Sequence, residues 1–144
     1  MPHDKLRILF LCTGNSCRSQ MAEGWARQLR GEQIHVHSAG LEPKGLDPYA
    51  VKVMKEAGVD ISHQKSKHLR EVLDHDFDVV ITVCDNAYEN CPVFPRPVRV
   101  VHHNFDDPPR LAAELSEEEE ILGPYRRVRD ELREFVETLP DAVI

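Results

Sequence analysis

The sequence predicts an α/β fold, a three-layer sandwich in which helices cover both faces of a central four-stranded parallel sheet. The segments 7–11 and 78–83 are short and apolar, which is typical of strands buried on both faces of a parallel sheet. Segments with apolar residues at helical spacing alternate with such strands along the chain. This alternation favours parallel strands joined by right-handed crossovers.

The expected elements alternate as strand and helix from the N-terminus onwards. Strands are expected at 7–11, 33–38, 78–83 and 98–102. Helices are expected at 19–30, 48–57 and 85–90, with a last one after Pro124, where one face carries Val128, Leu132, Phe135 and Val136. Pro48 and Gly58 delimit the second helix, because proline suits a first helical turn and glycine ends helices. We expect the acidic run 117–120 to be a solvated surface.

Composition limits the classes of function. The 144 residues, 41% of them hydrophobic, fit a single domain spanning residues 1–144. A net charge of −7 argues against non-specific binding to nucleic acid or to an anionic membrane, since both require a basic footprint. The apolar run 8–12 is too short for a transmembrane span or a signal peptide, so we expect a cytoplasmic protein and a monomer. In a reducing cytosol, the four cysteines favour catalysis, redox chemistry or metal binding.

The most informative segment is 12–19, which leaves the first strand and enters the first helix. A helix N-terminus at the carboxyl end of a parallel strand offers free N–H groups to an anion. The small residues at 13–16 allow those amides to form a cradle. Arg18 adds a fork for two oxyanion oxygens, and this field is expected to make Cys12 a thiolate nucleophile. The predicted substrate-binding residues are Thr13, Gly14, Asn15, Ser16, Cys17, Arg18 and Ser19.

A plainer interpretation of this segment is a buried cysteine followed by an ordinary turn. Strand, small-residue loop, Arg-Ser and helix occur in the order that anion binding requires, however, and this favours the functional interpretation. A nucleotide-binding phosphate loop is excluded because its terminal Gly-Lys-Ser/Thr is absent.

Two further cysteines follow the strand at 78–83. Cys84 is expected at the same edge of the sheet as Cys12, since both follow parallel strands. Cys91 lies seven residues later, and an intact helix between them separates the two by about 10.5 Å, from the ~1.5 Å rise per residue. A disulfide usually needs Cα atoms within roughly 7 Å, so the spacing suggests a redox switch that unwinds the segment. Two unrelated buried thiols, or zinc ligands together with His102 and His103, are the alternatives, and the spacing fits zinc poorly.

The segment 12–24 resembles the signature of the thioredoxin-coupled arsenate reductases built on the low-molecular-weight tyrosine phosphatase fold. The resemblance continues through the segments 38–40, 83–85, 90–92, 105–108 and 127–131. It therefore covers nearly the whole chain, and it implies an enzyme that reduces arsenate to arsenite in arsenical resistance.

This resemblance implies a relay of three cysteines. Cys12 attacks arsenate, which the loop amides and Arg18 hold, and Cys84 then attacks the Cys12 sulfur. Arsenite leaves, and a transient Cys12–Cys84 disulfide remains. Cys91 resolves it to a final Cys84–Cys91 disulfide, which thioredoxin reduces. Cys17 has no place in the relay, and no bound cofactor is expected.

The resemblance also implies a general acid at Asp107, because departure of hydroxide from arsenate requires a proton donor. Asp106 has the same chemistry, and aspartate before proline is also common as a turn or helix cap. Ser19 is expected to cap the first helix, to donate to Cys12, or both. Asn15 is expected to brace the loop in a left-handed conformation, which asparagine tolerates.

One position departs from the resembling reductases. Several of them bind potassium near the loop through Asn, Glu, Ser and Asp, and the first three have counterparts here in Asn15, Glu23 and Ser38. Lys67 stands where the aspartate is expected. Its ammonium can supply the charge of the cation internally, so we expect no bound metal.

Two other functions compete with arsenate reduction. A low-molecular-weight protein tyrosine phosphatase shares Cys12, Arg18 and an aspartic acid, yet it has no need of Cys84 or Cys91. A thiol-based redox or arsenic sensor binds its ligand without turnover. Weak phosphatase side activity is expected in any case, because phosphate and arsenate are similar oxyanions.

Overall fold

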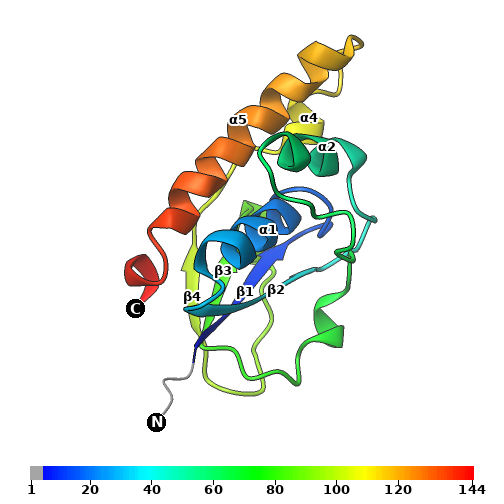
Figure 1. Cartoon of the computed structure of the whole chain (residues 1–144). Coiled ribbons are helices and arrows are strands. Elements are labelled where there is room, and N and C mark those ends of the chain that lie inside the picture. Colours follow the sequence, from blue (N-terminus) through cyan, green and yellow to red (C-terminus); the bar gives the residue numbers. More distant parts are fainter. Residues whose placement is uncertain (1–4) are drawn as a thin grey trace.

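The computed structural model describes residues 5–144, which form a parallel sheet of four strands with helices around it (Figure 1). The strands are β1 (Leu6–Cys12), β2 (Ile34–Gly40), β3 (Val79–Thr82) and β4 (Arg99–His102). They stand in the order β2-β1-β3-β4, and every pairing is parallel. The predicted fold class is confirmed. β2 extends two residues beyond its predicted end because Gly40 pairs with Cys12.

The order of the strands creates the crevice in which the site lies. From β1 the chain passes through α1 (Arg18–Arg30) to β2 on one side, and then through α2 (Pro48–Glu56) to β3 on the other side. Connections that leave two adjacent parallel strands in opposite directions open a ligand crevice at the carboxyl ends of those strands. Cys12 ends β1 and Cys84 follows β3 by two residues, so both cysteines lie at this switch point.

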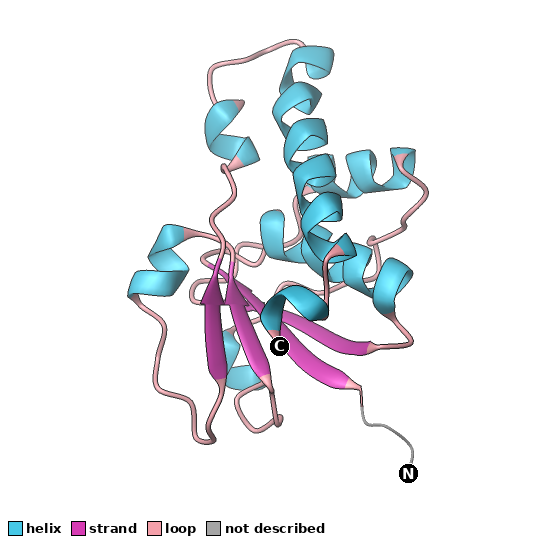
Figure 2. Ribbon diagram, turned by 90° about the vertical axis from the view of Figure 1, so that its left-hand side faces the viewer, coloured by secondary structure: helices cyan, strands magenta, loops and turns pink. Residues whose placement is uncertain are grey.

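Apolar side chains of β1 form the centre of the core. Ile8, Leu9, Phe10 and Leu11 are fully buried, as expected for a strand covered on both faces. The long helix α5 (Glu118–Glu137) packs against α1 and α2, and Figure 2 shows it running upright above the fan of strands. Among the helices of residues 5–144, none has both the length and the apolar character needed to cross a bilayer.

The start of α5 differs from the expectation that Pro124 precedes the helix. The helix begins at Glu118, and Pro124 lies inside it. Leu122 and Tyr125 are buried, and their packing outweighs the backbone hydrogen bond that proline removes. The acidic residues of the first turn favour this start, because carboxylates stabilise the positive end of a helix.

Four short helical segments complete the chain. The helix predicted at 85–90 is α3 (Asp85–Glu89), and α4 (Pro108–Leu111) follows the Asp106-Asp107 pair. Two single turns of 3₁₀-helix lie at Leu69–Glu71 and Asp141–Val143. Both α3 and α4 border the switch point, so the site is enclosed by short elements on a rigid sheet.

Candidate active site

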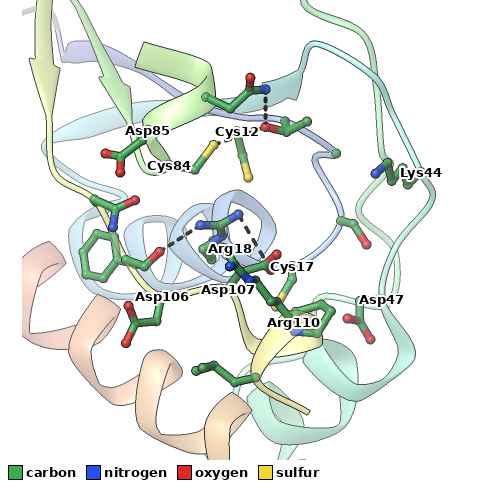
Figure 3. A pocket seen from close by; sticks show the side chains of 18 residues that line it. Cys12, Cys17, Arg18, Lys44, Asp47, Cys84, Asp85, Asp106, Asp107 and Arg110 are labelled. Atoms are coloured by element: carbon green, nitrogen blue, oxygen red, sulfur yellow. Dashed lines mark hydrogen bonds and ion pairs between the residues drawn. The ribbon is translucent and has the colours of Figure 1, made fainter. Parts of the chain in front are cut away.

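A cavity of about 880 Å³ opens at the carboxyl ends of β1 and β3 (Figure 3). It brings together most of the residues that the sequence predicted for the site: Cys12, Thr13, Gly14, Ser16, Cys17, Arg18, Cys84 and Asp107. Asn15 and Ser19 are fully buried and do not line the cavity, and Cys91 lies outside its lining, beyond α3. The cavity is larger than a tetrahedral oxyanion needs, since it extends from the loop towards α4.

Asn15 holds the loop in shape from behind. Its φ angle is 45°, the left-handed conformation expected from the sequence. Its amide nitrogen donates to the hydroxyls of Ser19 (2.8 Å) and Ser38 (2.9 Å), and its amide oxygen accepts from the backbone N–H of Lys67 (2.9 Å). Gly40 lies against the loop so closely that a Cβ atom there would stand 2.7 Å from the carbonyl oxygen of Thr13.

Ser19 does not cap α1. The N-cap is Cys17, whose side chain makes no capping hydrogen bond, and Ser19 is the second residue of the helix. The hydroxyl oxygen of Ser19 accepts from Asn15, so Ser19 belongs to the support of the loop. A hydrogen bond from Ser19 to Cys12 stays a prediction. The start of α1 therefore has no side-chain cap, which leaves its first N–H groups available to an anion.

Arg18 points into the cavity and carries an unused donor. One terminal nitrogen donates to the carbonyl oxygen of Phe105 at 2.8 Å, and the other lies 3.7 Å from Asp107 Oδ1. Its Nε is buried and has no hydrogen-bond partner within residues 5–144. A buried N–H without an acceptor costs free energy that a bound ligand can restore.

The structure separates the two adjacent aspartates. Asp106 turns towards α5 and pairs with Arg127 at 2.9 Å. Asp107 lies beside Arg18 in the cavity, and its side chain makes no capping bond to α4, whose N-cap it is (Figure 3). Asp106 also lines the cavity, but its carboxyl pairs with Arg127, so the carboxyl of Asp107 is the better placed to exchange a proton with a ligand beside Arg18.

Cys12 and Cys84 lie close enough for each to shift the pKa of the other. The neighbouring sulfur of Cys84 and burial raise the pKa of Cys12 well above its usual value. Cys12, the hydroxyl of Thr13 at 3.3 Å and the backbone N–H of Ala87 lower the pKa of Cys84 to about 5. Arg18 and the backbone N–H of Thr13 act in the opposite direction and lower the pKa of Cys12, so the expectation of a Cys12 thiolate stays a prediction.

The other two cysteines are protonated thiols at neutral pH. Burial, with Asp47 and Asp107 nearby, raises the pKa of Cys17 well above its usual value. Burial also raises the pKa of Cys91. A thiol whose pKa is raised in this way is a poor nucleophile. This agrees with leaving Cys17 out of the chemistry, and it makes Cys91 less reactive than a fully exposed thiol.

Lys67 lies in the position expected from the sequence, next to a buried carboxylate. Its ammonium is 3.9 Å from Glu23 Oε1, and this same oxygen accepts from the Ser38 hydroxyl at 2.6 Å. Ser38 in turn accepts from Asn15. The positive charge therefore lies two hydrogen-bonded side chains behind the loop. In the part of the chain that the structure describes, no group of three or more His, Cys, Asp or Glu side chains could hold a metal ion.

Four charged residues of the cavity were not foreseen from the sequence as site residues: Lys44, Asp47, Asp85 and Arg110. Asp47 precedes Pro48, caps α2 by accepting from the N–H of Tyr49 at 2.9 Å, and accepts from the Tyr125 hydroxyl at 2.7 Å. An aspartate before a proline signals a helix cap in sequence, but its place in the cavity depends on how the loop after β2 folds back. For Lys44 and Arg110 the sequence holds no signal.

Comparisons with known proteins agree with the geometry. Residues 7–144 match the family described as low molecular weight phosphotyrosine protein phosphatase. An arsenate reductase of Bacillus subtilis (strain 168) is 50% identical over 135 residues, covering 91% of this chain and 95% of that protein. One from Bacillus licheniformis is 51% identical over 132 residues, covering 92% and 93%.

Solved structures give the same result. A structure described as an arsenate reductase in the phosphate binding state superposes with a TM-score of 0.74 at 34% identity, over 96% of this chain and 99% of that one. A low molecular weight protein tyrosine phosphatase from T. tengcongensis superposes with a TM-score of 0.72 at 26% identity, over 96% and 100%.

Proposed function

Since the chain belongs to the low molecular weight phosphotyrosine protein phosphatase family, we propose that it is an arsenate reductase that works through a relay of three cysteines and is recycled by thioredoxin. One observation carries the proposal: a second cysteine, Cys84, lines the same cavity as Cys12, with its sulfur 3.3 Å from the hydroxyl of Thr13 in the oxyanion loop. A phosphatase needs one thiol there. A reductase needs two, because arsenic must give up a bond to the first sulfur when the second attacks.

The first step needs only a short proton movement. The proton between the two sulfurs passes from Cys12 to Cys84, and the resulting Cys12 thiolate is stabilised by Arg18 and the N–H of Thr13. Cys12 attacks arsenic, and Asp107 donates the proton with which a hydroxyl leaves as water. Arg18 and the loop amides hold the remaining oxygens, and the buried Nε of Arg18 gains its acceptor.

Electron transfer follows at the same sulfurs. Cys84 first releases to water the proton that it took from Cys12. Its thiolate then attacks Sγ of Cys12, and the sulfur–arsenic bond breaks with its electron pair on arsenic. Arsenite leaves and the Cys12–Cys84 disulfide remains, so two thiols are oxidised as arsenic gains two electrons. Cys91 then attacks Cys84 and releases the Cys12 thiolate, and the dithiol of thioredoxin reduces the Cys84–Cys91 disulfide.

Turnover with purified components tests the proposal. Arsenate, thioredoxin, thioredoxin reductase and NADPH should give arsenate-dependent NADPH oxidation, and glutathione with glutaredoxin should support it poorly. Cys12→Ser, Cys84→Ser and Cys91→Ser should each abolish turnover, whereas Cys17→Ser should retain it. Binding of arsenate without arsenite production would indicate a sensor and contradict the proposal. We place the enzyme in the cytoplasm as a monomer that detoxifies arsenic, and gel filtration tests the monomer.

Phosphatase side activity is supported by the cavity itself. Cys12, Arg18 and Asp107 are the groups that phosphate-ester hydrolysis requires, and the space between the loop and α4 admits an ester group. Hydrolysis of p-nitrophenyl phosphate should be lost in Cys12→Ser and retained in Cys91→Ser. Faster phosphatase turnover than arsenate turnover would make the phosphatase the main function.

A further inference from the structure

α3 occupies the stretch of chain between the last two cysteines of the proposed relay. It spans Asp85–Glu89, its N-cap is Cys84, and Cys91 follows two residues after its end. The N–H of Cys91 donates to the carbonyl of Tyr88 at 3.4 Å, so the turn continues to that point. Seven residues of helix span about 10 Å, against roughly 7 Å for disulfide reach. The segment must therefore lose its helical form before Cys84 and Cys91 can bond.

A helix of five residues is not stable by itself, so contacts from outside must hold α3. One side chain, His102 at the end of β4, contacts both ends of it. His102 Nε2 donates to Asp85 Oδ1 at 2.8 Å, at the first residue of the helix. The ring of Tyr88, one turn later, stacks on the His102 ring with centroids 4.5 Å apart and planes 20° apart.

The histidine is itself fixed to the sheet. In the neutral ring, Nδ1 accepts from the hydroxyl of Thr82 at 2.7 Å, and Thr82 is fully buried in β3. The other end of the contact is open to water, since the side chain of Asp85 is 69% exposed. Water can therefore replace the Asp85 hydrogen bond when α3 loosens, whereas the bond to Thr82 remains. The hydrogen bond between His102 and Asp85 can therefore stabilise α3 and still break when the helix unwinds.

We propose that His102 is a positioning residue of the relay: it holds α3 helical, and its release from Asp85 and Tyr88 controls formation of the Cys84–Cys91 disulfide. The proposal rests on the proposed function for its place in the reaction. It assigns to His102 a role in the second disulfide step and none in the first, because Cys84 already lies against Cys12 while α3 is folded.

A matched pair of variants separates this role from general packing. His102→Phe keeps an aromatic ring against Tyr88 and removes both hydrogen bonds. His103→Phe changes the adjacent histidine, which stacks on Phe105 (4.5 Å) and Phe135 (4.7 Å). In the reduced protein without arsenate, amide hydrogen exchange across 86–90 should be about fivefold to tenfold faster in His102→Phe, from the loss of a charge-assisted hydrogen bond. It should be unchanged in His103→Phe.

The closing step is measured in a chain that carries Cys12→Ser and Cys17→Ser. Hydrogen peroxide oxidises the Cys84 thiolate to a sulfenic acid and releases hydroxide. Cys91 then attacks the Cys84 sulfur, which forms the disulfide and releases water, while dimedone competes for the sulfenic acid. The ratio of disulfide to dimedone adduct should rise about fivefold in His102→Phe and stay constant in His103→Phe. The dimedone rate alone comes from the same chains with Cys91→Ser.

Unchanged exchange in His102→Phe, or faster exchange with an unchanged ratio, overturns the proposal. Tyr88→Leu removes the stacking and leaves the sheet untouched, so it keeps the test available if His102→Phe does not fold, and its ratio should rise as well. Neither measurement uses arsenate or thioredoxin. If the unmodified chain fails to reduce arsenate while both readouts move, the proposed function is wrong and the control of the disulfide by His102 stands.

Discussion

Replacing Asp107 by asparagine tests the assignment of the general acid, with Asp106→Asn as the matched control. The two carboxyls are neighbours in sequence, but their surroundings differ. Asp107 Oδ1 lies 3.7 Å from Arg18 Nη2 in the cavity, whereas Asp106 pairs with Arg127 on α5 at 2.9 Å. Asparagine keeps the size of either side chain and removes its ability to give up a proton.

The expected magnitudes follow from these surroundings. Loss of a general acid lowers turnover by roughly 10²–10⁴-fold, so Asp107→Asn should fall in that range. The Asp106–Arg127 pair is solvent-exposed, with side-chain exposures of 57% and 47%. Exposed pairs contribute little, so Asp106→Asn should lower turnover less than about fivefold.

Single-turnover arsenite release, measured with the enzyme in excess over arsenate, isolates this step from recycling by thioredoxin. The defect of Asp107→Asn should appear in the rate at saturating enzyme, with little change in the concentration of half-saturation. Equal losses in the two variants would refute the assignment, and so would full activity of Asp107→Asn.

The remaining predictions concern the charges and the loop. The ultraviolet absorbance of the Cys84 thiolate should titrate near pH 5, with the thiolate present above that pH. Thr13→Val should raise the midpoint because Cys84 loses a hydrogen-bond donor. A single midpoint near pH 9 would contradict the lowered pKa of Cys84. Potassium at constant ionic strength should leave the thermal stability of the unmodified chain unchanged and should stabilise Lys67→Asp, since the ammonium beside Glu23 is then gone; a potassium-specific shift in the unmodified chain would refute this. Asn15→Ala should lower the free energy of unfolding by about 2–4 kcal/mol, from the left-handed backbone and the buried hydrogen bonds, as measured by urea denaturation. Asn15→Gly, which tolerates the backbone, should lose less.

The site elements that the sequence predicted well depend on local signals. The strand, small-residue loop and helix at 6–30 are contiguous, and the left-handed Asn15 follows from the tolerance of one residue type. Cys84 could be placed beside Cys12 because parallel strands end at a common edge. Such inferences need the order of the strands and little else.

The predictions that failed depend on contacts between distant segments. The start of α5 was misplaced because Pro124 is a local stop signal, whereas burial of Leu122 and Tyr125 is a property of the packed protein. The interaction of Cys84 with Thr13 and with the backbone N–H of Ala87 was not foreseen either, because the folded sheet sets the positions of these groups. The pairing of Asp106 with Arg127 likewise joins two parts of the chain that are 21 residues apart.

The hydrogen bond from Arg18 to the carbonyl of Phe105 gives Arg18 a second role besides oxyanion binding. The carbonyl lies two residues before Asp107, so the guanidinium that we propose to bind the oxyanion also positions the segment that carries the proposed proton donor. Arg18→Lys removes both the guanidinium contacts to the oxyanion and the hydrogen bond to the Phe105 carbonyl. Its kinetic defect should therefore combine weaker oxyanion binding with a misplaced general acid. A phosphate ester whose leaving group needs no protonation distinguishes the two effects. With such an ester, the lysine variant should regain the part of its turnover that was lost through the misplaced general acid. The part lost through weaker binding of the oxyanion should remain lost.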